Sequence, residues 1–357
     1  MIIMDFYTAN LIITLAFLSV TVIDVCTNRV IDNKMKKGSI LVCLFIGISI
    51  FCEWLGVKTN GADVSLISIH RIVKLIEFCM APVISVASAF SYSQVKRPKL
   101  ILSVLIIHIL FQLVSLKEGW VFYVDAENIY HRQRLYWIYI ATFSVSILYC
   151  FKNIVREEMK FYRKPAAVLI ATLMFLTMGI SIQMFKPDLR VDYMCVAIGN
   201  FLLYNHRCKM IFQLDGLTHL FNRRCYEKDI KKINFPTVIL NMDINKFKVI
   251  NDTYGHSTGD YYLKTIAKII RKTYGKYGSC YRLGGDEFCV ILDRNIDDVQ
   301  KMNDRFRQSI NEMRKADNRA PDISIGYAYY NEKNEHVKKI IEEADEMMYN
   351  NKHQPTA

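Results

Sequence analysis

The sequence lacks cysteines at metal-binding spacing. Its ten cysteines include no C-x-x-C pair, and none joins histidines in a cluster with zinc-like spacing. The sequence therefore gives no support for a structural zinc site. Several cysteines lie within apolar runs, and we interpret them as reduced, small apolar residues; examples are Cys43, Cys52, Cys79, Cys150 and Cys195.

Acidic residues are also in deficit, with 34 Asp and Glu against 46 Lys and Arg and a net charge of +12. A basic excess can indicate a nucleic-acid partner. Here many of the basic residues flank long apolar runs, where they set membrane topology, and the rest suit a phosphate-handling site. We therefore expect no nucleic-acid partner.

Apolar residues make up 52% of the chain, a high share for a purely soluble protein, and the long runs all precede His206. A hydrocarbon core about 30 Å thick needs roughly 20 apolar residues in a helix. A cleaved signal peptide would explain only the first run. We predict a bundle of about seven helices in the lipid bilayer over residues 1–205 and a connector over 206–214; the spans are 7–25, 39–57, 74–93, 100–116, 135–151, 166–185 and 191–205.

The distribution of basic residues over the loops predicts an orientation. The first, third and fifth loops are richer in Lys and Arg than the others, and Lys36, Arg97 and Lys160 are examples. Basic loops favour the cytoplasm. We therefore expect a multi-pass protein of the inner (cytoplasmic) membrane, with its N-terminus outside and residues after 206 in the cytoplasm.

Three ionisable residues fall inside or at the ends of the predicted spans: Glu53, Glu77 and His108. Such residues are costly in a bilayer and are candidates for function, here a pocket for an unknown sensory ligand. The alternative, which we favour, is that the two glutamates extend to the outer interface. Trp54 and Trp120 fit an aromatic belt at that interface.

After His206 the apolar pattern becomes short and mixed. We predict a helical connector to Leu214, a helix from an N-cap at Thr218 to about Lys232, and a strand from Phe235 to Asn241. Further helices are expected over 257–275, 297–315 and 335–352, and further strands over 279–283, 287–292 and 323–330. This order indicates an α+β domain whose mainly antiparallel, ferredoxin-like (palm-like) sheet is flanked by helices.

Carboxylates fall at the ends of predicted neighbouring strands. Asp243 ends one strand, and Asp286 and Glu287 lie at a hairpin turn after Gly284-Gly285. A cation relieves the repulsion between such groups, and carboxylates on adjacent strands suit two-metal phosphoryl transfer. The alternative is a capping residue and a solvated turn. An EF-hand is excluded, because Phe247 and Lys248 stand where an oxygen ligand and a glycine are needed.

Five ordered motifs make residues 215–352 closely resemble the GGDEF-domain diguanylate cyclases. The motifs are Asp215-x-Leu217-Thr218 with Asn222-Arg223-Arg224; Asp243-x-Asn245-x-Phe247-Lys248-x-x-Asn251-Asp252 with Gly255-His256 and Gly259-Asp260; Arg282-x-Gly284-Gly285-Asp286-Glu287-Phe288; Ser324-Ile325-Gly326; and Ala344-Asp345-x-x-Met348-Tyr349-x-x-Lys352. The resemblance does not extend to residues 1–205.

The resemblance implies an enzyme that condenses two GTP into cyclic di-GMP, for second-messenger signalling controlled by the membrane domain. Asp243, Asp286 and Glu287, with the Ile244 carbonyl, would hold two Mg²⁺ (or Mn²⁺), and Asp286 would activate the 3′-hydroxyl. Asn251 and Asp260 would read guanine. The triphosphate would lie against Phe247, Lys248 and Lys352. Because each domain would bind one GTP, activity would require a homodimer.

Three departures from the family pattern matter. Gly275 and Gly278 stand where many members carry an inhibitory Arg-x-x-Asp, so we expect no product inhibition there. The tail His353–Ala357 replaces a Gly-Arg-Asn-like end, which predicts weaker phosphate binding. Asn245 replaces a commoner Asp that is not an assigned ligand. Two other hypotheses remain: a degenerate domain that only binds GTP or a protein, and a transporter with a regulatory domain.

Overall fold

The computed structural model describes residues 5–93, 95, 98–159, 167–185, 189–233, 236–294, 296–331 and 336–353. The chain forms two compact units, Met1–Lys209 and Met210–Ala357. Each unit has its own packing and is described by itself.

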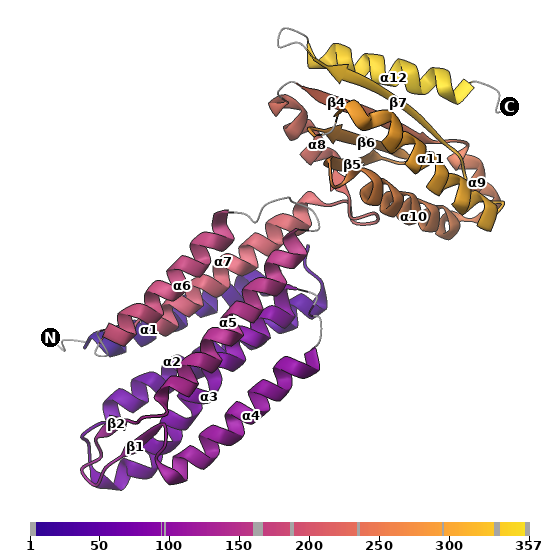
Figure 1. The fold of residues 1–357 in the computed structure, drawn as a ribbon. Coiled ribbons are helices and arrows are strands. Elements are labelled where there is room, and N and C mark those ends of the chain that lie inside the picture. Colours follow the sequence, from indigo (N-terminus) through magenta and orange to yellow (C-terminus); the bar gives the residue numbers. More distant parts are fainter. Residues whose placement is uncertain are drawn as a thin grey trace. The chain divides into compact units, whose positions relative to one another are not determined.

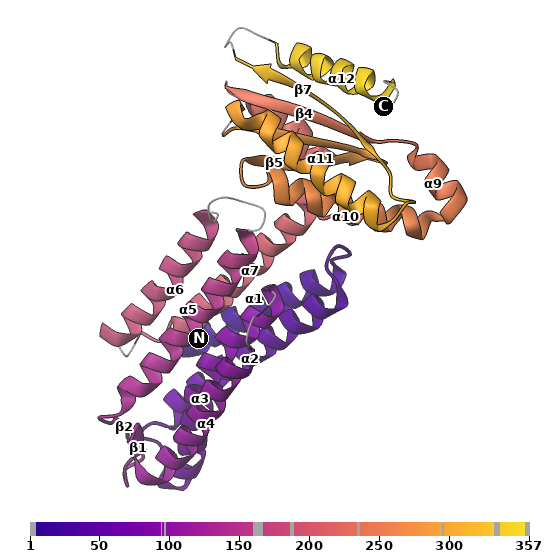
Figure 2. The same ribbon diagram turned by 45° about the vertical axis from the view of Figure 1, so that its right-hand side comes forward.

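The first unit is a bundle of long helices that run side by side (Figures 1 and 2). Five of its helical segments are long and apolar enough to cross a membrane: Phe6–Thr27, Asn33–Thr59, Val64–Tyr92, Pro98–Glu118 and Tyr136–Glu158. Crossings by the next two helices remain predictions. The helices are α1 (Phe6–Thr27), α2 (Asn33–Thr59), α3 (Ile67–Tyr92), α4 (Pro98–Glu118), α5 (Tyr136–Glu158), α6 (Ala167–Phe185) and α7 (Asp192–Gln213).

The outer surface of this bundle is apolar. Ile13 and Ile23 on α1 and Ile107 on α4 are each about three-fifths exposed, at 59%, 62% and 66%. Large apolar side chains presented outward in this number favour contact with lipid rather than with water. The bundle therefore has the surface of a membrane-embedded region.

A short hairpin that the sequence reading missed lies between α4 and α5. Its strands are β1 (Phe122–Val124) and β2 (Tyr130–Arg132), paired antiparallel. The buried Asn128 in its turn adopts a φ of 62°. The Asn128 amide donates to the Thr59 carbonyl at 2.8 Å and its oxygen contacts His70 Nδ1 at 2.9 Å. These bonds join the hairpin to the end of α2 and the start of α3.

The expectation that Glu53 and Glu77 extend to an interface is wrong. Their exposed fractions are only 2% and 6%. Glu77 accepts a hydrogen bond from Lys74 Nζ at 2.6 Å, and Lys74 is itself 2% exposed. Lys74 thus supplies a charged partner that holds the Glu77 carboxylate inside the bundle.

The second unit is an α+β domain, which confirms the predicted fold class. Its strand order is β3-β5-β6-β4-β7, with every pair antiparallel except β3 and β5. The elements are β3 (Phe221–Asn222), α8 (Arg223–Asp229), β4 (Thr237–Ile244), α9 (Phe247–Tyr254), α10 (His256–Tyr274), β5 (Gly278–Gly284), β6 (Glu287–Leu292), α11 (Val299–Ala316), β7 (Ile323–Tyr330) and α12 (Val337–His353).

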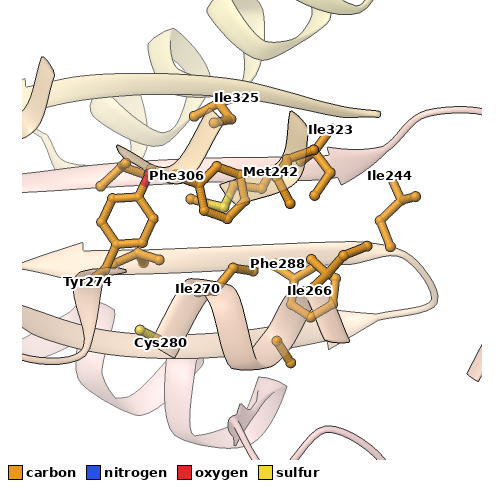
Figure 3. Packing of buried hydrophobic residues seen from close by; sticks show 14 of the residues in the cluster. Met242, Ile244, Ile266, Ile270, Tyr274, Cys280, Phe288, Phe306, Ile323 and Ile325 are labelled. Carbon is orange, nitrogen blue, oxygen red and sulfur yellow. The ribbon is translucent and has the colours of Figure 1, made fainter. Parts of the chain in front are cut away.

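Alternation along the strands divides the sheet into two faces. On one face, side chains such as Met242 and Phe288 pack against Ile266 and Ile270 of α10 and Phe306 of α11 (Figure 3). On the other face α12 packs against β7, and Asn241 of β4 donates to the Asp345 carboxylate at 2.6 Å. Side chains at odd-numbered positions of β4 therefore point toward α12.

The predicted helix start at Thr218 is wrong. The Thr218 hydroxyl and amide both donate to Asp215 Oδ1, at 2.6 and 2.8 Å, and His219 has a φ of 57°. This closes a turn instead of a helix. The helix α8 begins at Arg223, where the Asn222 side chain accepts a hydrogen bond from the Cys225 amide as N-cap.

Candidate functional site

Asp243 lies near the C-terminal end of β4, opposite Glu287 of β6 and Ser324 of β7. Its side chain is on the α12 face of the sheet. There its Oδ1 atom accepts a hydrogen bond from Lys352 Nζ at 2.6 Å, and the Asp243 side chain is only 13% exposed. A lysine on the last helix thus neutralises a carboxylate from the central strand.

Asp286 lies in the turn between β5 and β6, next to the end of β4. Its carbonyl accepts a hydrogen bond from the Ile244 amide at 3.4 Å. Burial raises the pKa of the Asp286 carboxyl, and the nearby Asp243 carboxylate raises it further. The strand-end carboxylates predicted to be neighbours are therefore close enough to repel each other, and an added cation would stabilise both.

Arg282 holds the turn that carries Asp286. Its Nε and Nη2 atoms both donate to the Gly285 carbonyl, at 3.1 and 2.8 Å. Its Nη1 atom donates to Asp215 Oδ1 at 3.0 Å. Burial opposes ionisation of Asp215, but the hydrogen bonds from Thr218 and Arg282 outweigh it and lower the pKa of this carboxyl.

Arg282 and Asp215 belong to two of the sequence motifs, and no role in the site was predicted for either. The structure joins them into one network. The strand is irregular between Arg282 and Gly284, so alternation along β5 could not have indicated that Arg282 reaches the turn.

The predicted guanine-reading residues lie around the junction of α9 and α10. Gly255, with a φ of 82°, separates the two helices. A Cβ atom on Gly259 would collide with Asn251 Oδ1 and closely approach the Phe247 ring, so only glycine fits beside them. Asn251 is therefore packed next to the residue that precedes Asp260. The Asp260 side chain is exposed and accessible to a ligand.

The two residues expected along the triphosphate differ in their surroundings. Phe247 is partly buried and packs against the core, whereas Lys248 is exposed. The third, Lys352, contacts Asp243 instead of open solvent. Residues 354–357, where the departure from the family tail was noted, lie outside the described residues.

The oxygen groups at the strand ends are chemically suited to a hard cation. Asp243 and Asp286 supply carboxylates, while Glu287 is exposed at the rim. In the described part of the chain, no three His, Cys, Asp or Glu side chains gather as a metal cage. Mg²⁺ binds through one or two carboxylates, with water and substrate phosphates completing its shell, so the donor set fits Mg²⁺ better than a cation that needs a full protein cage.

Asn245 has a structural partner. Its side-chain Oδ1 atom accepts a hydrogen bond from the Ser324 hydroxyl at 2.7 Å. Its backbone N–H donates to the Asp322 carbonyl at 2.9 Å. An amide oxygen serves this contact without adding negative charge. That Asn in place of Asp is tolerated here stays a prediction.

Comparison with known proteins identifies the C-terminal part. Residues 212–357 match the family described as "Diguanylate cyclase, GGDEF domain", so this part of the chain is a GGDEF domain. The chain is 39% identical over 118 residues to diguanylate cyclase A of Treponema denticola, covering 32% of each protein. It is 35% identical over 151 residues to diguanylate cyclase DgcN of Escherichia coli, covering 39% of this chain and 37% of that protein.

Other matches have the same extent. The chain is 31% identical over 148 residues to uncharacterized protein YhcK of Bacillus subtilis, covering 38% of this chain and 41% of that protein. It spans less than half the length of these curated relatives. A similar solved structure is the GGDEF domain of DgcB from Caulobacter crescentus in complex with c-di-GMP, with 28% identity, a TM-score of 0.35, and coverage of 39% of this chain and 90% of that one.

Proposed function

We propose that this chain is a membrane-bound diguanylate cyclase, which condenses two GTP into cyclic di-GMP and two pyrophosphates. The observation that carries the proposal is the juxtaposition of Asp243 and Asp286 at the end of β4, with Lys352 beside them. The named diguanylate cyclases among its relatives support the same reaction.

Asp286 is the proposed base. A 3′-hydroxyl of one GTP attacks the α-phosphorus of the other, the new P–O bond forms, and the bond to pyrophosphate breaks. The hydroxyl proton passes to Asp286. A carboxyl whose pKa is raised by burial and by Asp243 is a better proton acceptor than an ordinary aspartate. The same step on the second pair of groups closes the ring.

The remaining residues bind and orient the substrate. Asn251 and Asp260 bind the guanine edge, and an aspartate there accepts from the N1–H and the neighbouring amino group, a pair of donors that adenine does not offer. Lys248 and Lys352 neutralise the triphosphate, and Phe247 fixes the start of α9 against the core. Bound to Asp243, Asp286, the Ile244 carbonyl and Glu287, Mg²⁺ would supply charge neutralisation of the phosphates.

Each domain would bind one GTP and supply one attacking hydroxyl. Two domains must therefore face each other about a two-fold axis, and the active form would be a homodimer. The same reasoning makes the membrane bundle a regulator, because it could control whether the two domains meet. We further propose that the N-terminus is outside and the GGDEF domain is in the cytoplasm, where GTP is available.

Incubation of the full chain in lipid nanodiscs with Mg²⁺ and either GTP or ATP tests substrate and reaction together. We expect cyclic di-GMP from GTP and no cyclic product from ATP, with Asp304→Ala as a control at an exposed aspartate on the same domain. Binding of GTP without any product would favour the degenerate-domain hypothesis, and uptake of a solute by vesicles would favour the transporter.

A further inference from the structure

Two acidic side chains meet inside the helical bundle, away from the GGDEF domain. Glu53 lies on α2 and Asp192 lies in the first turn of α7. Their exposed fractions are 2% and 9%. We call them the Glu53–Asp192 pair.

The carboxyl groups of the pair are close enough to interact with each other. Glu53 Oε1 and Asp192 Oδ1 nevertheless find no hydrogen-bond donor among the described residues. Two carboxylates offer only acceptors, so a hydrogen bond between them requires a proton on one of them. Shared protons of this kind are found wherever like charges are forced together in a site of low polarity.

Neighbouring charges do not remove this need. Lys74 is already engaged by Glu77, with their Nζ and Oε2 atoms 2.6 Å apart. Arg190 is the other nearby cation. Three acids thus face two bases, and one added proton balances the cluster.

The titratable and charged groups around the pair are Cys52 on α2, His70, Lys74 and Glu77 on α3, Tyr130 on β2, Tyr136 and Tyr139 on α5, Arg190 before α7, and Tyr193 and Cys195 on α7.

The nature of the occupant follows from the groups present. Across the described ranges, His, Cys, Asp and Glu form no cluster of three able to hold a metal ion. Glu53 and Asp192 are packed among helices, and a proton needs no cavity. The proton is therefore the occupant that the geometry favours.

The pair is placed to act on the cyclase domain through one helix. The helix α7 starts at Asp192 and continues without a break to Gln213, which belongs to the second unit. An ionised carboxylate in a first turn is stabilised by the helix dipole, and a protonated one is not. A change of protonation thus alters the anchoring of a helix of 22 residues whose other end enters the GGDEF domain.

The same end of the bundle carries the β1–β2 hairpin. His70 on α3 contacts Asn128 in that hairpin at 2.9 Å, and the Lys74 ammonium lies 5.3 Å from the centre of the Tyr130 ring. The pair therefore lies near the loops at the membrane face opposite the end where α7 leaves the bundle. Protons from the solution at that face therefore have only a short distance to travel to the Glu53–Asp192 pair.

We propose that the Glu53–Asp192 pair is a proton-binding site through which the acidity of the compartment at that membrane face controls the cyclase. The regulation of cyclase activity by this site rests on the proposed function, whereas proton binding by the pair does not. Protonation and deprotonation change the contact between α2 and the start of α7, and α7 transmits that change.

Trp54 provides a readout that is independent of catalysis. It follows Glu53 directly, and its Nε1 atom donates to Thr8 Oγ1 at 3.0 Å. The full chain with Trp120→Phe and Trp137→Phe would be placed in liposomes, and Trp54 fluorescence followed while pH is varied on each side separately. We expect the fluorescence to titrate with pH on the hairpin side and the titration to be lost in Glu53→Gln with Asp192→Asn.

The amide variants keep the size and a hydrogen bond, and each single substitution is measured as well, so that a folding defect in the double variant does not decide the matter. Glu118→Gln, at an exposed position ending α4, is the matched control and should keep the titration. Fluorescence that is independent of pH, or a titration that survives the double substitution, would overturn the site.

Cyclase activity is measured in the same liposomes with the pH around the GGDEF domain held constant. We expect activity to follow the pH on the hairpin side in the unaltered pair and to be insensitive in the amide variants. A fluorescence titration without any change of cyclase activity would overturn the proposed regulation of the cyclase by the pair. Absence of cyclic di-GMP at every pH would instead contradict the proposed function, and the Trp54 result would still decide proton binding.

Discussion

Arg282 and Asp215 are joined by a hydrogen-bonded ion pair, with Arg282 Nη1 3.0 Å from Asp215 Oδ1. Asp215 follows the end of α7 by two residues, and Arg282 also holds the Gly285 carbonyl in the turn that carries Asp286. The first residues after α7 are therefore bonded directly to the turn that carries Asp286.

Substitution of Arg282 tests whether this pair positions Asp286. We expect Arg282→Ala to lower kcat on the order of tenfold to a hundredfold, because small displacements of reacting groups have effects of this size. The KM for GTP should change little, since Arg282 is not among the proposed guanine or phosphate contacts. A loss confined to KM would contradict the positioning role, and Arg223→Ala, at an exposed arginine paired with Glu227, is the control.

Asp215 gives a prediction of pH dependence. Its pKa is lowered in the folded domain, so its contribution to stability is complete above the ordinary carboxyl value of about 4 and is lost as pH falls toward the lower folded value. Asp215→Asn should therefore unfold at lower urea concentration than the unaltered chain at pH 7, and the difference should narrow in acid. If the difference in urea concentration at unfolding grew in acid, it would contradict a lowered pKa of Asp215 in the folded domain. Asp304→Asn, at an exposed aspartate, should show neither effect.

Lys352 is bonded to Asp243, and in the proposed function binding of substrate exchanges this contact for one with phosphate. Lys352→Met should weaken GTP binding by about tenfold, in line with the loss of one charge-assisted contact of roughly 1.5 kcal/mol. Isothermal titration measures it, with Lys338→Met, on the exposed start of α12, as control. Unchanged affinity for GTP would leave Lys352 as a counter-ion to Asp243 alone.

Gly278 makes a further departure from the family testable. A Cβ atom there would collide with the backbone of Ile291 on β6, so an aspartate cannot be accommodated without moving the strand. We expect cyclic di-GMP at high concentration to leave the rate unchanged in the full chain. We also expect Gly278→Ala to reduce the stability of the domain by about 1–3 kcal/mol through overpacking. Strong inhibition by cyclic di-GMP would contradict the expected absence of product inhibition. A Gly278→Ala variant of unchanged stability would contradict the expected overpacking.

Several features of the domain could be predicted from its sequence because local pattern and long-range packing agree there. A β-rich run marked β4, alternation marked β6, and the adjacent glycines marked the turn at Asp286. The neighbouring positions of Asp243 and Asp286 followed from strand ends alone. Tertiary contacts decided what could not be predicted: Thr218 looks like an N-cap, but its hydroxyl bonds back to Asp215.

The helical bundle shows more clearly which contacts cannot be predicted from the sequence. Apolar runs located its helices, yet nothing in the sequence around Glu53 reveals that Asp192 lies beside it. Partners from helices far apart in the chain have no local pattern. For the same reason the hairpin at Phe122–Arg132, held by Asn128, was not foreseen.

The most direct test of the central claim is the product formed from GTP and Mg²⁺ by the full chain and by Asp286→Ala, quantified by liquid chromatography and mass spectrometry. Asp286 lies in a turn and contributes little packing, so the variant should fold with an unchanged circular dichroism spectrum. We expect cyclic di-GMP and pyrophosphate in a ratio of one to two from the unaltered chain and none from the variant. Equal synthesis by both proteins, or no synthesis by the unaltered chain, would contradict it.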